Sequence, residues 1–454
     1  MQRNEAILTA GDEKRHITHE FTVSEGAQSV RVCLRYARGP ADLGNMLTVT
    51  LFDPAGFRGE CHRSGHSEGE WRIHDISINA GSATHGFIAG APPAGVWRVV
   101  INTHRVSDDC PYQLDIITDA APTDPAGPSA TQQAHNAGQT STGSKAGWLR
   151  GDLHAHTFHS DGHWEAEALV AWAESSGLDF VTLSDHNTTA GLNALQRAAQ
   201  GRLIALGGME LTTYYGHALA LNIDHWIDWR IGDDRTMRDI AGEVIAAGGV
   251  YIIAHPHAIG DPICTGCHWD YNDMQPGVAR LVEVWNGGGW ANESYNELGL
   301  AQYYHWLNEG CRLVATAGTD IHGQPNTREP FGFSVIFAPH GTPAGLFEGL
   351  RAGHIFLSSG PHLEISAQQA DGQMAMMGDS MAAKPARIRA AWREAKSAVL
   401  RWVANGRAVH ERPIAETGEH ELPLGNIDAA WCSAEIRQDG KLLALANPIF
   451  FDGR

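Results

Sequence analysis

The amino-acid sequence predicts an α/β protein in which a barrel of alternating strands and helices is flanked by two β domains. Three observations support this fold class. Short alternating apolar runs fill residues 1–121, strand-like and helical runs alternate over residues 147–360, and helical runs largely vanish again over residues 361–454. At 454 residues the chain is also too long for a single hydrophobic core, so more than one domain is expected.

The first 121 residues are expected to form a β-sandwich. Apolar runs such as SVRVCLRY, MLTVTLF and VWRVVIN are separated by clusters of Gly, Pro, Asn and Asp, without a convincing helical run between them. This spacing is typical of antiparallel strands in a two-sheet domain. Residues 122–146 are then poor in large apolar side chains, which predicts a linker.

The central segment has a different pattern. Strand-like runs such as DFVTLS, RLIALGG and GVYIIAH alternate with helical runs such as HWEAEALVAWAESSG and DRTMRDIAGEVIAAGG, and the helical runs end at glycine. Such alternation predicts parallel strands joined by right-handed crossovers. Seven or eight such units over about 210 residues favour a closed barrel over an open sheet. The last segment, with runs such as HLEISA and AVLRWVAN, is expected to form a smaller β domain.

Composition and charge limit the classes of function. The chain has 43% hydrophobic and 19% charged residues, as a globular enzyme does, and no apolar run of 18 residues that could cross a membrane. The N-terminal segment lacks the apolar core of a secretory signal, so we expect a cytoplasmic protein. A net charge of −19 argues against a long nucleic acid as partner, although a small anion can still enter a locally positive metal pocket. An oligomer is compatible with these totals.

The cysteine content argues against a disulfide framework, whereas the histidine content suggests a metal site. Seven cysteines, an odd number spread along the chain, do not indicate a disulfide framework, and reduced thiols fit the cytoplasm. The segment CTGCH, from Cys264 to His268, looks like a haem-attachment site, but a structured, redox-sensitive loop over a metal rim is the preferred interpretation. The 25 histidines are unusually many and suggest a metal.

Potential metal ligands recur where strand-like runs end. His154 and His156 are two residues apart at the end of WLRGDLHAH, so their side chains point to the same side of a strand. Barrel enzymes carry their active sites at the C-terminal ends of the strands, where these groups would meet. Imidazoles and carboxylates gathered there predict a metal centre. The further candidates at or just after strand ends are Asp161, Asp185, His186, Glu210, His217, His255, His257, Asp320 and His322.

Two of these candidates have a plain alternative. Asp185 could cap the next helix or support His186, rather than bind a metal. His257 follows a proline and could orient substrate, donate a proton or have no role. Any one histidine of the set could be an ordinary hydrogen-bonded residue, so it is the joint pattern on one rim that favours a metal site.

On these residues, the central segment resembles the polymerase and histidinol phosphatase (PHP) superfamily of metal-dependent hydrolases. The resemblance covers about residues 147–360 and implies a distorted (β/α)7 barrel that binds up to three divalent metals. All nine ligand positions of the family are filled. The implied ligands are His154, His156, Glu210 and Asp320 for one metal, Glu210, His217 and His255 for a second, and Asp161, His186 and His322 for the third.

The flanking segments add a weaker resemblance. LFDPAG, APPAGVW, SSGPHLEIS and ANPIFF look like the carbaryl-hydrolase-like (CehA/McbA) branch of the same superfamily. The name of that branch reflects the substrate of one member and does not define the reaction of this chain.

Charge favours phosphoester chemistry at such a centre. Six neutral imidazoles and three carboxylates carry three negative charges, which three divalent cations would exceed, so an anionic substrate and a hydroxide are favoured. Two metals can share a water, lower its pKa towards ~7 and direct this hydroxide at phosphorus. Asp161, His186 and His257 are candidates for catalytic roles, and so is Arg328, which could bind phosphate as a fork or form a surface salt bridge.

The sequence leaves other readings open. A carbamate or amide hydrolase could use the same metals, and a noncatalytic binding protein could carry a vestigial barrel. A nuclease role is disfavoured by the negative charge. Tyr214 and Tyr215 could bind substrate or pack the rim, and the ligand types suit Zn, Mn and Fe alike.

Overall fold

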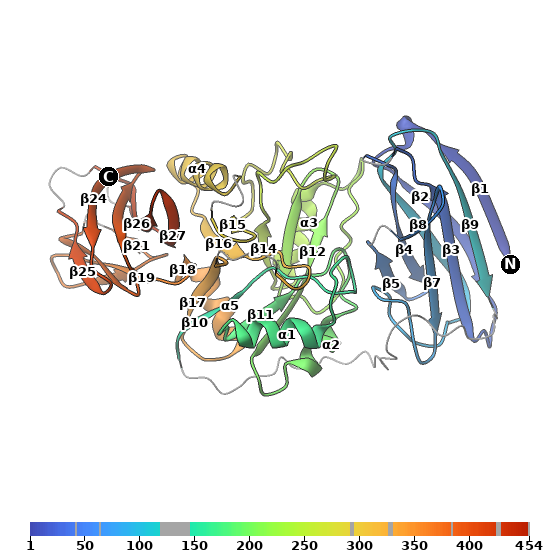
Figure 1. Ribbon diagram of the computed structural model, residues 1–454, viewed down its shortest axis with the longest axis horizontal. Coiled ribbons are helices and arrows are strands. Elements are labelled where there is room, and N and C mark those ends of the chain that lie inside the picture. The colour runs from blue at the N-terminus through green and yellow to red at the C-terminus, as the bar shows by residue number, and fades with distance from the viewer. Residues whose placement is uncertain are drawn as a thin grey trace.

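The computed structural model of the protein describes residues 1–40, 43–62, 65–118, 146–290, 295–325, 330–382, 385–423 and 428–452. The molecule is elongated, with the N-terminal β-sandwich at one end, a central α/β part and C-terminal β-sheets at the other end (Figure 1). Except for Ala146, the predicted linker 122–146 lies outside the described residues, as does Arg328.

The N-terminal part consists of two antiparallel sheets around one hydrophobic core. Alternate residues of its central strand, such as Val30, Val32 and Leu34, are buried between the sheets, as strand periodicity requires. One sheet has the order β1 (Gln2–Leu8), β9 (Cys110–Thr118), β3 (Ser29–Ala37), β7 (Trp71–Asn79) and β6 (His66–Glu68). The other has the order β2 (His16–Val23), β8 (Gly95–Arg105), β4 (Met46–Asp53) and β5 (Gly56–Cys61), and a short 3-10 helix, η1 (Ala10–Asp12), precedes β2.

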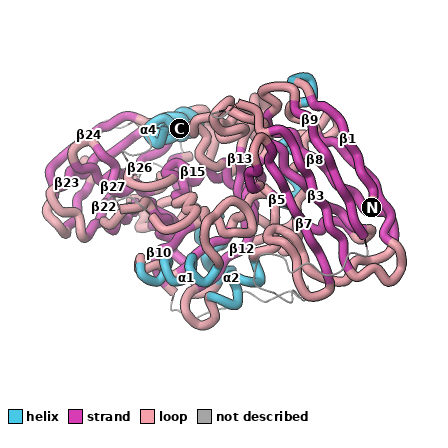
Figure 2. Tube along the Cα trace, turned by 45° about the vertical axis from the view of Figure 1, so that its right-hand side comes forward, coloured by secondary structure: helices cyan, strands magenta, loops and turns pink. Residues whose placement is uncertain are grey.

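The central part is a mixed sheet with helices packed against it. Figure 2 shows the strands in magenta and the helices in cyan. The strands have the order β16 (Val314–Gly318), β15 (Leu281–Asn286), β14 (Val250–Ile253), β13 (His217–Leu221), β12 (Ile204–Thr212), β11 (Phe180–Leu183), β10 (Gly147–Asp152), β17 (Phe333–Ala338) and β18 (Ile355–Ser358). The helices among the described residues are α1 (Ala166–Ser175), α2 (Leu192–Ala198), α3 (Met237–Ala246), α4 (Tyr295–Asn308) and α5 (Pro343–Ala352).

The α/β character agrees with the sequence prediction, but the strand directions differ from it. Strands β10, β11 and β12 are parallel, as are β14, β15 and β16. However, β13 is antiparallel to both of its neighbours, and β17 is antiparallel to β10 and β18. The four residues between Thr212 and His217 are too few for a crossover, so β12 and β13 form a hairpin. The strand pairs therefore do not show the closed (β/α)7 barrel that we expected.

Helix α5 was not anticipated from the sequence, although its ends carry standard signals. The Thr342 side chain accepts a hydrogen bond from the Gly345 N–H, and Pro343 occupies the first turn. Gly353 ends the helix in the left-handed conformation with φ of 76°. The sequence does not indicate this helix because TPAGLFEGLRAG contains one proline and three glycines, which weaken a helical pattern.

Hydrogen bonds also join the chain beyond β10 to the chain beyond β16. The Asp320 N–H donates to the His154 carbonyl at 2.8 Å, and the His156 N–H donates to the Ile321 carbonyl at 3.0 Å. Below them, the Thr319 N–H donates to Asp152 Oδ1 at 2.9 Å. Two segments about 165 residues apart in sequence thus lie side by side, with their histidines and carboxylates adjacent.

The C-terminal strands continue the central sheet rather than forming an isolated domain. Strand β18 pairs with β27 (Lys441–Ala446), which extends the sheet through β26 (Trp431–Gln438), β23 (Ala398–Ala404) and β24 (Arg407–Ile414). A second core, which includes Phe356 of β18, lies beneath it. The smaller elements are β19 (His362–Gln368), β20 (Met374–Met376), β21 (Ser380–Met381), β22 (Arg387–Arg393), β25 (Gly418–Glu421) and β28 (Ile449–Phe451). Within the described residues, helices are too short or too polar to cross a membrane.

Candidate metal centre

The nine predicted ligands all lie at one end of the central sheet. They belong to the segments that follow β10, β11, β14 and β16, and to β12 and the start of β13. Their donor atoms form three groups, and within each group all donor atoms lie within 4.8 Å of one another. The groups are His154, His156, Glu210 and Asp320 (group 1), Glu210, His217 and His255 (group 2), and His156, Asp161, His186 and His322 (group 3).

Glu210 is at the middle of the centre. Its side chain is fully buried, and its Oε2 atom lies 3.3 Å from His154 Nε2 and 3.4 Å from His156 Nε2. The other oxygen, Oε1, lies 3.0 Å from His217 Nδ1 and 3.2 Å from His255 Nε2. One carboxylate therefore faces groups 1 and 2 with different oxygens, as a bridging ligand does.

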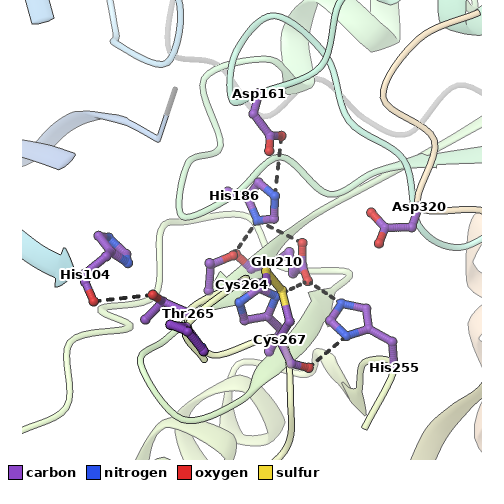
Figure 3. Close-up of a disulfide and its surroundings, with 12 residues drawn as sticks. His104, Asp161, His186, Glu210, His255, Cys264, Thr265, Cys267 and Asp320 are labelled. Carbon is purple, nitrogen blue, oxygen red and sulfur yellow. Dashed lines mark hydrogen bonds and ion pairs between the residues drawn. A yellow bond between two sulfur atoms is a disulfide. The ribbon is translucent and has the colours of Figure 1, made fainter. Parts of the chain in front are cut away.

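Group 3 lies on the other side of His156. Asp161 Oδ1 is 3.1 Å from His322 Nε2 and 3.4 Å from His186 Nε2, and Figure 3 shows His186 between Asp161 and Glu210. The ring of His156 stacks on those of His186 and His322, at centroid distances of 4.4 and 4.3 Å. Because these rings are in contact, group 3 is continuous with group 1.

The charges within this buried cluster stabilise one another. Burial would lower the pKa of His154, but Asp320, Glu283 and Glu210 outweigh it and hold the pKa well above its ordinary value. Burial would raise the pKa of Asp320, yet His154 and His156 keep it well below the usual carboxyl range. In contrast, burial lowers the pKa of His156 to about 3, with help from neighbouring imidazoles. An imidazole binds a metal in its neutral form, so bound ions would take the place of the protons that balance these carboxylates.

The centre opens to solvent at group 3. The side chains of Asp161 and His322 are 37% and 34% exposed, and that of Asp320 is 23% exposed. By contrast, His154 is 0% and Glu210 1% exposed. A ligand from solvent would therefore reach the centre at the Asp161–His322 side.

Unpaired buried atoms test whether these residues fit metal ions. A buried polar atom without a partner costs free energy, so such atoms are rare and need an explanation. Six such atoms belong to five of the nine ligands, where divalent ions would satisfy them. Among the described residues the unpaired ligand atoms are His154 Nε2, His156 Nδ1 and Nε2, Asp161 Oδ1, Glu210 Oε2 and His217 Nε2.

The backbone at the site is also unusual. His255 and Asp320, two of the predicted ligands, have φ values of 26° and 51°, and Asn187, directly after His186, has a φ of 54°. Non-glycine residues rarely adopt this left-handed conformation, and where they do it is often at functional sites. The surrounding hydrogen bonds hold these residues in place at an energetic cost.

Glu283 is a functional candidate that the sequence analysis missed. It is buried on β15, and its carboxylate accepts hydrogen bonds from His154 Nδ1 at 3.1 Å, the His255 N–H at 3.1 Å and Asn286 Nδ2 at 3.0 Å. A carboxylate behind a ligand imidazole fixes its tautomer and orientation. The available signal was an acidic residue inside the apolar run RLVEVWN.

Asp185 supports the loop between two ligands. Its carboxylate accepts hydrogen bonds from the N–H and the hydroxyl of Thr157, both at 2.7 Å, and from Ser160 Oγ at 2.7 Å. This geometry fits the supporting alternative that the sequence left open, although Asp185 braces the loop from His156 to Asp161 rather than His186 itself.

The remaining predicted residues lie elsewhere. His257 is outside the three ligand groups, and its ring packs edge-on against His268 at 5.6 Å. Tyr214 is buried, and its hydroxyl donates to the Arg15 carbonyl of the sandwich at 2.9 Å, so it packs between domains. Tyr215 is 39% exposed, and Nζ of Lys14 lies over its ring, 4.6 Å from the ring centroid. The two tyrosines could bind substrate or pack the rim, and the contacts of Tyr214 agree with packing.

The CTGCH segment forms a disulfide beside the centre. Cys264 and Cys267 are bonded to each other, which corrects our expectation of reduced thiols and leaves neither sulfur for haem. The Cys267 carbonyl accepts a hydrogen bond from His255 Nδ1 at 3.2 Å, and Thr265 contacts the His104 carbonyl of the sandwich (Figure 3). The loop therefore orients one ligand of group 2. The free cysteines of the described residues are Cys33, Cys61, Cys110, Cys311 and Cys432.

Comparison with known proteins finds similarity only at the level of solved structures. No family model and no curated protein sequence matches the chain. A two-domain protein from Bacteroides vulgatus, containing a predicted PHP-like metal-dependent phosphoesterase, aligns with a TM-score of 0.40 and 16% identity over 67% of this chain and 95% of its own. An amidohydrolase from Chromobacterium violaceum with bound sulfate aligns with a TM-score of 0.28 and 17% identity, over 38% of this chain and 87% of its own.

Proposed function

We propose that this chain is a metal-dependent phosphoesterase that hydrolyses a small phosphomonoester or phosphodiester at a trinuclear centre. The observation that carries the proposal is the sharing of ligands between the three groups. Groups 1 and 2 share Glu210, and groups 1 and 3 share His156. Shared ligands place neighbouring ion sites side by side, which is the arrangement used by two-metal hydrolases.

Each part of the centre has a distinct role in this proposal. The buried residues of groups 1 and 2 hold ions away from bulk water, whereas the partly exposed Asp161 and His322 of group 3 admit the substrate. Bound divalent ions would lower the pKa of a water molecule and offset negative charge on the phosphoryl group. Glu283 and the Cys267 carbonyl hold the imidazoles of His154 and His255 in their ligand orientations.

Charge is the reason for preferring a phosphate ester to an amide or a carbamate. Six imidazoles and three carboxylates leave an excess of positive charge once three divalent ions are bound, and an anionic substrate offsets it. The proposal includes Zn, Mn or Fe as the ions, because imidazole and carboxylate ligands suit all three. The proposal also includes membership of the CehA/McbA branch, which the flanking segments resemble, but it does not assign the substrate of that branch to this chain.

Parallel assays test the reaction. The purified chain would be stripped with a chelator, reloaded separately with Zn, Mn or Fe, and given p-nitrophenyl phosphate, its diester and an aryl carbamate. We expect metal-dependent hydrolysis of a phosphate ester, with loss in His154→Ala and no loss in His305→Ala, whose imidazole is exposed on α4. Preferential turnover of the carbamate would replace the proposal with the amide-hydrolase alternative. Full activity after removal of metal would exclude both.

Metal content tests the trinuclear arrangement. Asp161→Asn removes a ligand of group 3 only, so it should lower the bound metal by about one ion per chain. Glu210→Gln removes a ligand shared by groups 1 and 2, and should lower it by about two. Elemental analysis of dialysed protein measures both values, and an equal loss in the two variants would contradict three separate ion sites.

A further inference from the structure

The N-terminal sandwich reaches the metal centre through the end of strand β5. The Glu60 carboxylate is fully buried and accepts hydrogen bonds from Trp229 Nε1 at 2.8 Å and from Asn187 Nδ2 at 3.2 Å. Asn187 directly follows the predicted ligand His186. The sandwich is thus hydrogen-bonded to the segment that carries His186 of group 3.

His62, two residues after Glu60, extends this contact to the ligand itself. Its imidazole packs on that of His186 with ring centroids 4.3 Å apart, and edge-on against His104 of β8 at 5.5 Å. Residues two apart on an extended chain point to the same side, so Glu60 and His62 both face the central domain. The side chain is 7% exposed.

Further contacts hold the sandwich that carries His62 against the central domain. The indole of Trp226 stacks on Phe57 of β5 at 4.3 Å and 4°, and the Tyr214 hydroxyl donates to the Arg15 carbonyl at 2.9 Å. Such contacts fix the register of the sandwich against the centre. An imidazole held in this way is pre-organised to contact a ligand.

One atom of His62 is not satisfied by these contacts. Nδ1 is buried and has no hydrogen-bond partner among the residues that the structure describes. Leaving a buried polar atom unpaired is costly. The three groups of ligand atoms do not include His62, although its electrostatic neighbours include His186, Asp161 and His217. The missing partner is therefore best supplied by a molecule bound at the centre.

We propose that His62 contacts the anionic group of the substrate beside Asp161 and His186, so that the N-terminal sandwich completes the active site. This inference rests on the proposed function, because it requires an anion at the metal centre. A neutral imidazole with its proton on Nδ1 donates one hydrogen bond to an oxygen of the phosphate ester or of the phosphate product. His62 is then a substrate-binding residue, and the sandwich takes part in selecting the substrate.

Two substitutions distinguish this contact from simple packing. His62→Ala removes the imidazole, whereas His62→Asn keeps an N–H donor close to the position of Nδ1. Calorimetry of the metal-loaded protein with inorganic phosphate gives a Kd, and p-nitrophenyl phosphate or its diester gives KM and kcat. Loss of a hydrogen bond to an anion should raise the phosphate Kd and the KM about tenfold or more in His62→Ala. His62→Asn should recover part of the loss.

The matched control is His66→Ala, which removes an exposed histidine of β6 in the same domain. It should leave the phosphate Kd and KM unchanged. Metal content and melting temperature should be equal in the wild type and in His62→Asn. A change in phosphate Kd or KM then reports on contact with the substrate and not on a structural role of His62.

Each other outcome overturns the inference. Wild-type phosphate affinity in a fully metal-loaded His62→Ala protein would show that His62 only packs, while the proposed function stands. Loss of metal from both His62 variants would make it a support of the ligands instead. If the loaded wild type neither hydrolyses phosphate esters nor binds phosphate, the proposed function fails and the inference fails with it.

Discussion

Glu283 lies directly behind His154, with its Oε1 atom 3.1 Å from Nδ1 of the imidazole. The opposite nitrogen, Nε2, faces Glu210 and Asp320 at 3.3 and 3.4 Å. One ring therefore lies between a carboxylate that orients it and two carboxylates of group 1. This arrangement commits Nε2 to the metal centre, because the hydrogen bond to Glu283 places the ring proton on Nδ1.

Replacing Glu283 should weaken metal binding without removing a ligand. Glu283→Gln keeps the shape of the side chain but removes the negative charge behind His154, so we expect a loss of metal affinity of about 10- to 100-fold. Competition with a chelating dye measures this affinity. Glu309→Gln, an exposed acidic residue paired only with His305 among the described ion pairs, serves as control. Equal metal affinity in the wild type and Glu283→Gln would contradict the orienting role.

Glu60 should make the stability of the protein depend on pH. Burial raises the pKa of Glu60 from 4.5 to about 7, although Trp229, Thr50 and Asn187 donate hydrogen bonds to the carboxylate. A carboxyl group with a raised pKa binds a proton more tightly in the folded state. Its contribution to stability is complete below the unfolded pKa and is lost as pH rises through about 7.

Glu60→Gln cannot lose a proton and isolates this effect. Between about pH 5 and about pH 8, the free energy of unfolding of the wild type should fall relative to that of the variant by about 2.5 kcal/mol. Urea unfolding of chelator-treated protein at several pH values gives both curves. Parallel curves would mean that Glu60 ionises normally in the folded protein.

The disulfide should matter for group 2. The Cys267 carbonyl accepts a hydrogen bond from His255 Nδ1 at 3.2 Å, and the Cys264–Cys267 bond restricts the loop that carries it. Reduction with dithiothreitol, or the double substitution Cys264→Ser and Cys267→Ser, should therefore lower metal affinity about tenfold. The double variant should no longer respond to dithiothreitol. A response that persists in this variant would come from binding of the metal by dithiothreitol, because the other cysteines are free.

The candidate site could be predicted from the sequence to an unusual extent. Paired ligands such as His154 and His156 have a spacing of two, which places both side chains on the same side of an extended segment. Other ligands follow apolar runs, and parallel strands that end at one edge of a sheet bring such residues together. Local spacing and strand ends are properties of the sequence itself, so the candidates could be named from it, and the family resemblance selected nine of them as ligands.

Other parts of the protein depend on contacts between distant segments. Glu60 and Trp229 are 169 residues apart, and no periodicity of the sandwich indicates that Glu60 and His62 face the metal centre. The hairpin that makes β13 antiparallel, and the pairing of β18 with β27, also follow from tertiary packing. The sequence determined which side chains could bind metal, because ligand chemistry and strand alternation are local. Only the tertiary structure decided which residues orient them and that His62 of the sandwich contacts His186, because those choices depend on burial against partners far along the chain.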